Sequence, residues 1–298
     1  MKILTFGEIL WDVFPQKKEI GGAAFNFAAH VAKLGADSYM ISKVGYDDMG
    51  RESLECADKL GVKRDFIIVE NVPTGYCKVT IDDAGIPTYN LVKGVSYDNL
   101  TVTKEMKKRL LGEEFDAFYF GTLPQRGEIT KKTLEDVLSY VKTKEIICDV
   151  NIRQKWYSKE TVENCAKYST ILKISEEECR VFEELGLVDR IEGNYREELC
   201  RRLSDKYDIR YVILTLGKYG AVVYVKSEDK FYVSRVPQGK PVSTVGAGDS
   251  FSACFVYNLV NGAAVEDCLE RAVTLSDYVV TKIGAVPDYE PGLLEKCR

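Results

Sequence analysis

The chain has 298 residues, 45% of them hydrophobic and 29% charged, and 41 basic against 46 acidic residues give a net charge of −5. This balance is typical of a globular protein and excludes an intrinsically disordered chain. The acidic surplus argues against binding to nucleic acid, and the apolar runs are too short for a transmembrane helix, which needs about twenty residues.

Strand and helix patterns alternate from the N-terminus. Residues 2–6 and 38–44 predict strands, whereas 23–34 and 48–60 predict helices because their apolar residues recur every three or four positions. Gly35 and Gly61 follow these helices and predict their ends. His30, the single histidine, lies in the first helix, so we expect it to have a structural role.

The pattern changes between residues 66 and 92. Short strands are predicted at 66–69, 76–81 and 88–92, with turn residues at 82–85 and no helix between them. We expect a small antiparallel β lid inserted in the α/β chain, built from about residues 12–21 and 70–98.

Regular alternation returns at residue 115. Strands are predicted at 115–120, 145–150, 170–174 and 210–216, with helices at 129–141, 161–168, 175–185 and 197–207 between them. A hairpin (221–225 and 231–234) and two helices (246–259 and 265–282) complete the chain. This order predicts one α/β domain over residues 1–298, with a doubly wound, mostly parallel sheet flanked by helices. Ligands of such sheets bind beyond the carboxyl ends of the strands.

The nine cysteines are scattered, and no two of them have the C-x-x-C spacing. We therefore expect reduced, buried thiols and no zinc site. The apolar stretch at the N-terminus is too short for a signal peptide. Together these features predict a cytoplasmic protein.

A glycine-rich turn, VGAGD at residues 245–249, precedes a helical pattern. Glycines let the backbone approach a ligand closely, and the amides at a helix N-terminus bind anions. The chain has no Walker A motif, and a dinucleotide fingerprint fails at Phe251. A capped helix that binds nothing remains an alternative. We expect Asp249 to be stabilised as an anion by the helix amides and able to accept a proton from a hydroxyl that attacks phosphorus.

Two stretches resemble the ribokinase-like (PfkB-type) carbohydrate kinases: GGAAFNFAAHVAKLG at 21–35, continued by VGYDDMG at 44–50, and STVGAGD at 243–249. The resemblance implies that the γ-phosphoryl group of ATP is transferred to a sugar hydroxyl with the help of Mg²⁺. Asp249 matches the catalytic base of the family, and the amides of Gly246, Ala247 and Gly248 match its anion hole.

The resemblance also implies a sugar site near the N-terminus. Asp12, which follows the first strand, matches the aspartate that binds sugar hydroxyls, and a carboxylate can accept hydrogen bonds from two of them. Gly22 and Asn26 would add a close backbone approach and a side-chain amide. A surface aspartate at a strand end is the alternative for Asp12.

A third stretch, DVNIR at 149–153, follows a predicted buried strand and is similar to that of fructokinase-like members. Strand-like alternation would place Asp149, Asn151 and Arg153 on one side of the loop, with Asn151 and Arg153 facing the sugar. The alternative is a solvated loop with a local Asp–Arg pair.

On the nucleotide side, SEEE at 175–178 forms a capping box. The resemblance implies that Glu178 holds Mg²⁺ through water, although Ser175 replaces the asparagine of the family and a purely capping role remains open. The motif TLGKYG at 215–220 matches a nucleotide-side turn of the family. The residues implied to bind nucleotide are Lys173, Ser175, Thr215, Gly217, Gly220, Gly284 and Ala285.

Ser243 stands where the family usually has an aspartate that helps to bind a monovalent cation. A neutral hydroxyl removes a charged ligand, so we expect little activation by K⁺.

These observations predict a sugar kinase, with fructose phosphorylated at O6 as the first choice. Ribose, 2-keto-3-deoxygluconate and nucleosides remain open as acceptors. A catalytically inactive, sugar-binding regulator is the alternative from another class. Neither nucleic acid nor a membrane is an expected partner, and exposed lid strands favour pairing into a homodimer.

Overall fold

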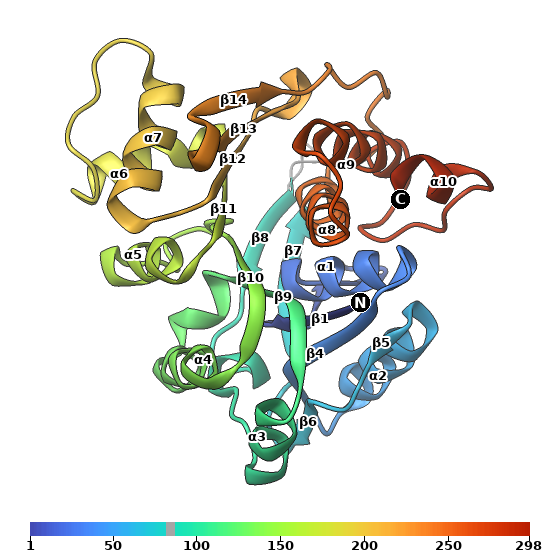
Figure 1. Cartoon of the computed structure of the whole chain (residues 1–298). Helices are drawn as coiled ribbons and strands as arrows, with labels where there is room; N and C mark the ends of the chain where they lie inside the picture. Colours follow the sequence, from blue (N-terminus) through green and yellow to red (C-terminus); the bar gives the residue numbers. More distant parts are fainter. Residues whose placement is uncertain (82–86) are drawn as a thin grey trace.

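The computed structural model describes residues 1–81 and 87–298 (Figure 1). The strands are β1 (Lys2–Phe6), β2 (Leu10–Val13), β3 (Lys18–Gly21), β4 (Asp37–Gly45), β5 (Val62–Lys63), β6 (Ile67–Glu70), β7 (Gly75–Ile81), β8 (Pro87–Leu91), β9 (Glu114–Gly121), β10 (Lys142–Asp149), β11 (Ile171–Ser175), β12 (Tyr211–Thr215), β13 (Ala221–Val225) and β14 (Lys230–Val233). The α-helices are α1 (Ala23–Lys33), α2 (Asp48–Leu60), α3 (Lys104–Leu111), α4 (Glu128–Tyr140), α5 (Lys159–Tyr168), α6 (Cys179–Glu184), α7 (Tyr195–Tyr207), α8 (Ala247–Val260), α9 (Val265–Val279) and α10 (Leu293–Cys297).

The large sheet has the strand order β14-β13-β12-β11-β10-β9-β1-β4-β5. From β12 to β5 every pair is parallel, whereas β13 and β14 are added antiparallel at one edge. The mostly parallel sheet expected from the βαβ order is therefore present, because helices return the chain to the same end of the sheet between strands.

Helices cover both faces of the large sheet (Figure 1). Ile3 in β1 and Tyr119 in β9 pack into a core with α1, α8 and α9. Their neighbours Leu4 and Phe118 point to the other face and pack with α3, α4, α5 and α7. Since successive side chains of a strand point to opposite faces, burial on both sides makes the strand sequences almost continuously apolar.

A second, four-stranded sheet has the order β3-β2-β7-β8. Its pairs β2–β3 and β7–β8 are antiparallel, as expected for the lid, and β2–β7 is parallel. The predicted strand at 66–69 is not part of it, because β6 pairs in parallel with β4 and places Ile67 opposite Ser42. The sequence of a strand as short as β6 does not indicate which other strand it pairs with. The turn predicted at 82–85 lies outside the described residues.

Some elements differ from the sequence patterns. Helix α3 was not predicted because only Met106 and Leu110 are buried in a strongly charged segment. The helix expected over 175–185 is divided into a 3-10 turn, η3 (Glu176–Glu178), and α6. All nine cysteines are free. In the described part of the chain, no helix is long and apolar enough to cross a membrane.

Candidate active site

A cavity of about 840 Å³ lies at the carboxyl ends of the parallel strands, bounded by the small sheet and the start of α8. Residues far apart in the sequence meet in its lining. Of those predicted to have a site role, the lining contains Asp12, Gly22, Asn26, Asn151, Arg153, Lys173, Ser175, Glu178, Thr215, Gly217, Gly220, Gly246, Ala247, Gly248 and Asp249.

The glycine-rich turn forms the start of α8, as its sequence predicts. Gly246 has a φ of 80°, and a Cβ at this position would lie 2.3 Å from the carbonyl oxygen of Ala285, so no side chain fits. The amide of Ala247 donates to the carbonyl of Thr244 at 3.3 Å. Helix geometry leaves the next amide, that of Gly248, without an intrahelical acceptor. Gly248 is therefore the better placed of the two amides to receive an anion.

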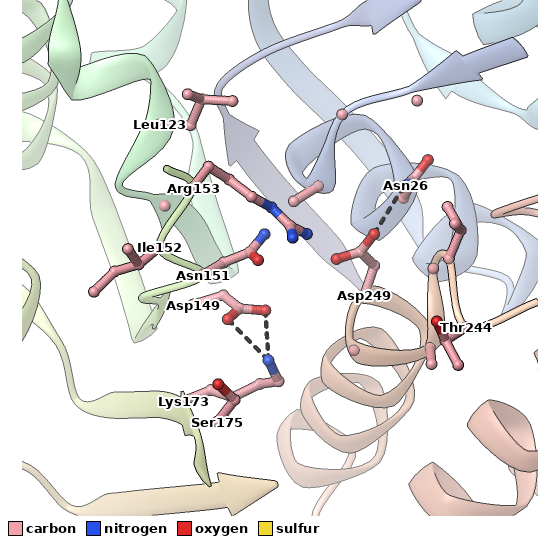
Figure 2. A pocket seen from close by; sticks show the side chains of 18 of the residues that line it. Asn26, Leu123, Asp149, Asn151, Ile152, Arg153, Lys173, Ser175, Thr244 and Asp249 are labelled. Atoms are coloured by element: carbon pink, nitrogen blue, oxygen red, sulfur yellow. Dashed lines mark hydrogen bonds and ion pairs between the residues drawn. The ribbon is translucent and has the colours of Figure 1, made fainter. Parts of the chain in front are cut away.

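Asp249 is buried in the first turn of α8, and its Oδ2 accepts a 2.7 Å hydrogen bond from Nδ2 of Asn26 (Figure 2). Burial, with a smaller contribution from the Asp149 carboxylate, raises the pKa of Asp249 to about 6, against the lowering effect of the Asn26 hydrogen bond and of the Lys173 and Arg153 cations. Desolvation outweighs the stabilisation of the anion expected from the helix amides, so the pKa lies above its ordinary value. At pH 7 the group is still mostly ionised and can accept a proton.

Lys173 and Asp149 form a buried ion pair beneath the turn (Figure 2). The Lys173 ammonium donates to both carboxylate oxygens of Asp149, at 2.8 and 2.9 Å. Burial lowers the pKa of Lys173, but the neighbouring Asp149 and Glu178 carboxylates raise it more, so its pKa lies above the ordinary value. A Cβ on Gly248 would lie 3.3 Å from this ammonium. The Lys173 ammonium, paired with Asp149, therefore lies beside the anion-binding turn.

The loop after β10 does not keep the expected alternation. Asn151 has a φ of 39°, in the left-handed region, which breaks the strand-like pattern. Asp149 turns to Lys173, whereas Asn151 and Arg153 point into the cavity, with the guanidinium of Arg153 directed towards Asp249 (Figure 2). The local Asp–Arg pair considered for this loop is thus replaced by the Asp149–Lys173 pair.

Asp12 lies in the small sheet, opposite Glu19 in β3 and Cys77 in β7. Burial and the charge of Glu19 raise its pKa, and the charge of Arg153 opposes the rise. The Arg153 guanidinium therefore lowers the pKa of two carboxylates that line the cavity, those of Asp12 and Asp249.

Glu178 joins two loops at the other end. Its Oε2 accepts from the amide of Ser175 at 2.7 Å, which is the predicted capping contact, and its Oε1 accepts from the amide of Ile152 at 2.5 Å. The turn between β12 and β13 adds Gly217 and Gly220, with φ values of 54° and 91°. This end of the cavity therefore combines backbone turns with the Glu178 carboxylate.

Two predicted nucleotide residues, Gly284 and Ala285, lie outside the cavity lining. Ala285 packs behind Gly246, and its carbonyl lies 3.0 Å from Nε2 of His30. The other ring nitrogen of His30 lies 2.5 Å from the hydroxyl of Tyr289, and burial lowers the His30 pKa to about 4. This histidine therefore has the structural role that was predicted.

Glu8 and Tyr119 are among the cavity residues to which the sequence assigned no role. Glu8 is the second residue after β1. Burial of its carboxyl group raises the pKa of Glu8 to about 7. Tyr119 stacks on Phe27 with ring centroids 4.0 Å apart, and its buried hydroxyl has no partner among the described residues. The rule that ligands bind beyond the carboxyl ends of strands would have identified Glu8. Tyr119 lies inside an apolar strand and gave no signal.

Comparisons with known proteins identify the family and agree with the fold. The family model "pfkB family carbohydrate kinase" matches residues 3–291. A probable fructokinase of Arabidopsis thaliana is 26% identical over 96% of this chain and 93% of its own length. The structure of a Xylella fastidiosa fructokinase with bound ATP has a TM-score of 0.83 at 17% identity, covering 99% of this chain and 97% of the other. An aminoimidazole riboside kinase of Salmonella enterica, in complex with its riboside and an ATP analogue, has a TM-score of 0.81 at 21% identity, covering 100% and 99%.

Proposed function

Because the chain belongs to the pfkB family of carbohydrate kinases, we propose that it transfers the γ-phosphoryl group of ATP to O6 of fructose. The observation that carries this proposal is the buried Asp249 at the start of α8, held by Asn26 within one cavity that also contains a glycine-rich anion turn. A base and an anion site side by side are what phosphoryl transfer to a hydroxyl requires.

The chain's own groups account for the steps of the transfer. Asp249 accepts the proton of the attacking sugar hydroxyl, whose oxygen then forms a bond to the γ-phosphorus while the bond to the leaving ADP oxygen breaks. The Gly248 amide and the Lys173 ammonium beside it oppose the negative charge on the transferred group. These donors are fixed before the reaction, so they need no reorganisation as charge develops.

The choice of acceptor rests on the sugar-side end of the cavity. Asp12, Asn151 and Arg153 supply an acceptor, an amide and a cation for sugar hydroxyls. A sugar that already carries a phosphate would need a cluster of basic groups, which these three residues do not form. The fructokinase-like stretch at 149–153 is the reason for choosing fructose over ribose, 2-keto-3-deoxygluconate or a nucleoside, and a probable fructokinase is among the similar proteins.

Glu178 fits an indirect role towards Mg²⁺. Both of its oxygens already accept backbone amides, so it would reach the ion through water and by its remaining lone pairs. Residues 1–81 and 87–298 contain no group of three or more potential metal ligands, so the phosphates and water would complete the coordination. When bound, Mg²⁺ neutralises phosphate charge.

We further propose that the small sheet acts as a lid and that its edge strands β3 and β8 support a homodimer.

A coupled assay for ADP release, run over ketoses, aldoses, 2-keto-3-deoxygluconate and nucleosides with MgATP, tests the proposal. Fructose is expected to give the highest kcat/KM, with fructose 6-phosphate as the product. Preference for another acceptor would refute the choice of fructose but would support the proposed kinase activity. Sugar binding without any ADP release would favour the non-catalytic regulator.

The rate should fall in acid with a midpoint near pH 6. Asp249 must be ionised to accept a proton, and its raised pKa of about 6 means that it becomes protonated as the pH falls through that value. The measurement is kcat/KM for the sugar against pH, which reports groups of the free enzyme. A profile that stays flat down to the ordinary aspartate value of 3.8 would contradict this assignment.

Replacing K⁺ by Na⁺ in the assay should change kcat little. The hydroxyl of Ser243 accepts the amide of Val245 at 3.3 Å, and serine supplies no charge for a cation. The matched variant Ser243→Asp restores the carboxylate and is expected to gain a K⁺ response. A steep K⁺ dependence of the unmodified protein would show that uncharged oxygens suffice.

A further inference from the structure

Helix α1 begins without a side-chain cap of its own. Its N-cap is Gly22, with a φ of 104°, and its first turn has no acidic residue. The first amides of a helix have no intrahelical acceptor and need one from elsewhere. Oε1 of Glu8 accepts from the amide of Ala24 at 3.4 Å. A carboxyl group from the loop after β1 thus caps α1 from a distant position in the chain.

Glu8 is fixed tightly at this place. It is 3% exposed, and a Cβ on Gly22 would lie 2.7 Å from the Glu8 carbonyl oxygen and 3.1 Å from its Cγ. Only glycine lets the start of α1 approach so closely. The positive end of the helix dipole favours an anion at this position, which partly offsets burial of the carboxyl group.

The capped helix carries the residue that touches the catalytic base. The backbone amide of Asn26 donates to the carbonyl of Gly22 at 2.8 Å, and its side-chain amide donates to Asp249 at 2.7 Å. A shift of the first turn of α1 would therefore move Nδ2 of Asn26 relative to Asp249.

We propose that Glu8 is a positioning residue that caps α1 and thereby holds Asn26 in place against Asp249. This inference rests on the proposed function of Asp249 as the base. The groups that act on Glu8 are its own backbone amide, the amides of Ala24 and Ala23, and the carboxylate of Asp249. From other elements, its charge also reaches the phenols of Tyr97 and Tyr119. None of these is a cation, so the favourable partners in this set are backbone amides, two of which belong to the start of α1.

An NMR titration of the full-length, substrate-free protein tests the cap without relying on turnover. The amide resonance of Ala24 should shift with pH in the unmodified protein as Glu8 ionises, and this step should disappear in Glu8→Gln. Asp249→Asn serves as the control, because it removes the other nearby carboxyl group and should keep the step. A Glu8→Gln variant with an unchanged Ala24 titration would overturn the cap.

A double-mutant cycle tests the connection to Asp249, using the acceptor that the unmodified enzyme turns over. Glu8→Ala is expected to lower kcat about tenfold, as a misplaced base would. Relative to Glu8→Gln, which also lacks the Glu8 charge, it should move the acid limb of the profile upwards, because the Asn26 hydrogen bond lowers the pKa of Asp249. Glu8→Gln, whose amide oxygen can still accept from Ala24, should recover most of the loss. In an Asn26→Ala background, Glu8→Ala should add little.

Additive losses in this cycle, or a Glu8→Gln variant as slow as Glu8→Ala, would overturn the inference. If Glu8→Ala does not fold, Glu8→Asp takes its place, since it shortens the cap by one methylene and should give an intermediate loss with the same upward shift. If the unmodified enzyme turns over no acceptor, the proposed function fails, and the titration of Ala24 still decides whether Glu8 caps α1.

Discussion

Asp249→Asn is expected to lower kcat by at least about a hundredfold, which is the scale of losing a general base, while the affinity for ATP stays nearly unchanged. Asparagine keeps the shape of the side chain but cannot take up the hydroxyl proton. Since Asp249 lies beside Asn26, at the end of the cavity proposed to bind sugar, the nucleotide contacts proposed for the turn after β12 should persist. Steady-state kinetics and ATP titration by calorimetry measure the two quantities.

Asp267→Asn provides a matched control. Asp267 is the third residue of α9, as Asp249 is of α8, but it is exposed, whereas Asp249 is 8% exposed. We expect this variant to retain the kcat of the unmodified protein. An Asp249→Asn enzyme that keeps most of its activity would show that another group accepts the proton.

Lys173→Met is expected to lower the free energy of unfolding by about 3–5 kcal/mol, because it leaves the buried Asp149 carboxylate without its counter-ion. The side chains of this pair are 6% and 1% exposed, so water hydrates the remaining carboxylate poorly. The same variant should weaken ATP binding, since the ammonium beside Gly248 is removed. Urea denaturation and ATP titration measure the two effects.

The double variant Asp149→Asn/Lys173→Met should recover much of the stability, because it removes the unpaired charge, but it should not recover ATP affinity. Lys144→Met serves as the surface control: Lys144 pairs with Asp116 at 2.6 Å, but its side chain is 73% exposed, so the change in stability should be small. Equal effects of Lys173→Met and Lys144→Met would refute the importance of the buried pair.

Local signals in the sequence were sufficient for most of the elements. The limits of β1 and α2 agree with the predicted ranges, and α1 differs by one residue, because helical periodicity and glycine stops are properties of adjacent residues. The glycine turn before α8 was predicted for the same reason, since the need for a residue without a Cβ at Gly246 is expressed within the motif itself.

Partners distant in the chain were not visible in the sequence. The strand pairing of β6 with β4 followed from tertiary packing, as did the choice of Lys173 over Arg153 as the partner of Asp149. Gly284 and Ala285 were predicted near the nucleotide by motif, and only the structure shows that Ala285 packs behind Gly246. In the first two cases the competing partners are chemically similar, and only their positions in space distinguish them.

The sequence alone determined the chemical identity of the site: a carboxylate after a glycine turn, at the carboxyl edge of a parallel sheet. The tertiary structure decided how that carboxylate behaves. Asp249 meets Asn26 across 223 residues of sequence, and the same packing buries it and raises its pKa to about 6. A local argument from helix amides gave the opposite direction, because desolvation depends on every segment that surrounds a group and not on its neighbours in the chain.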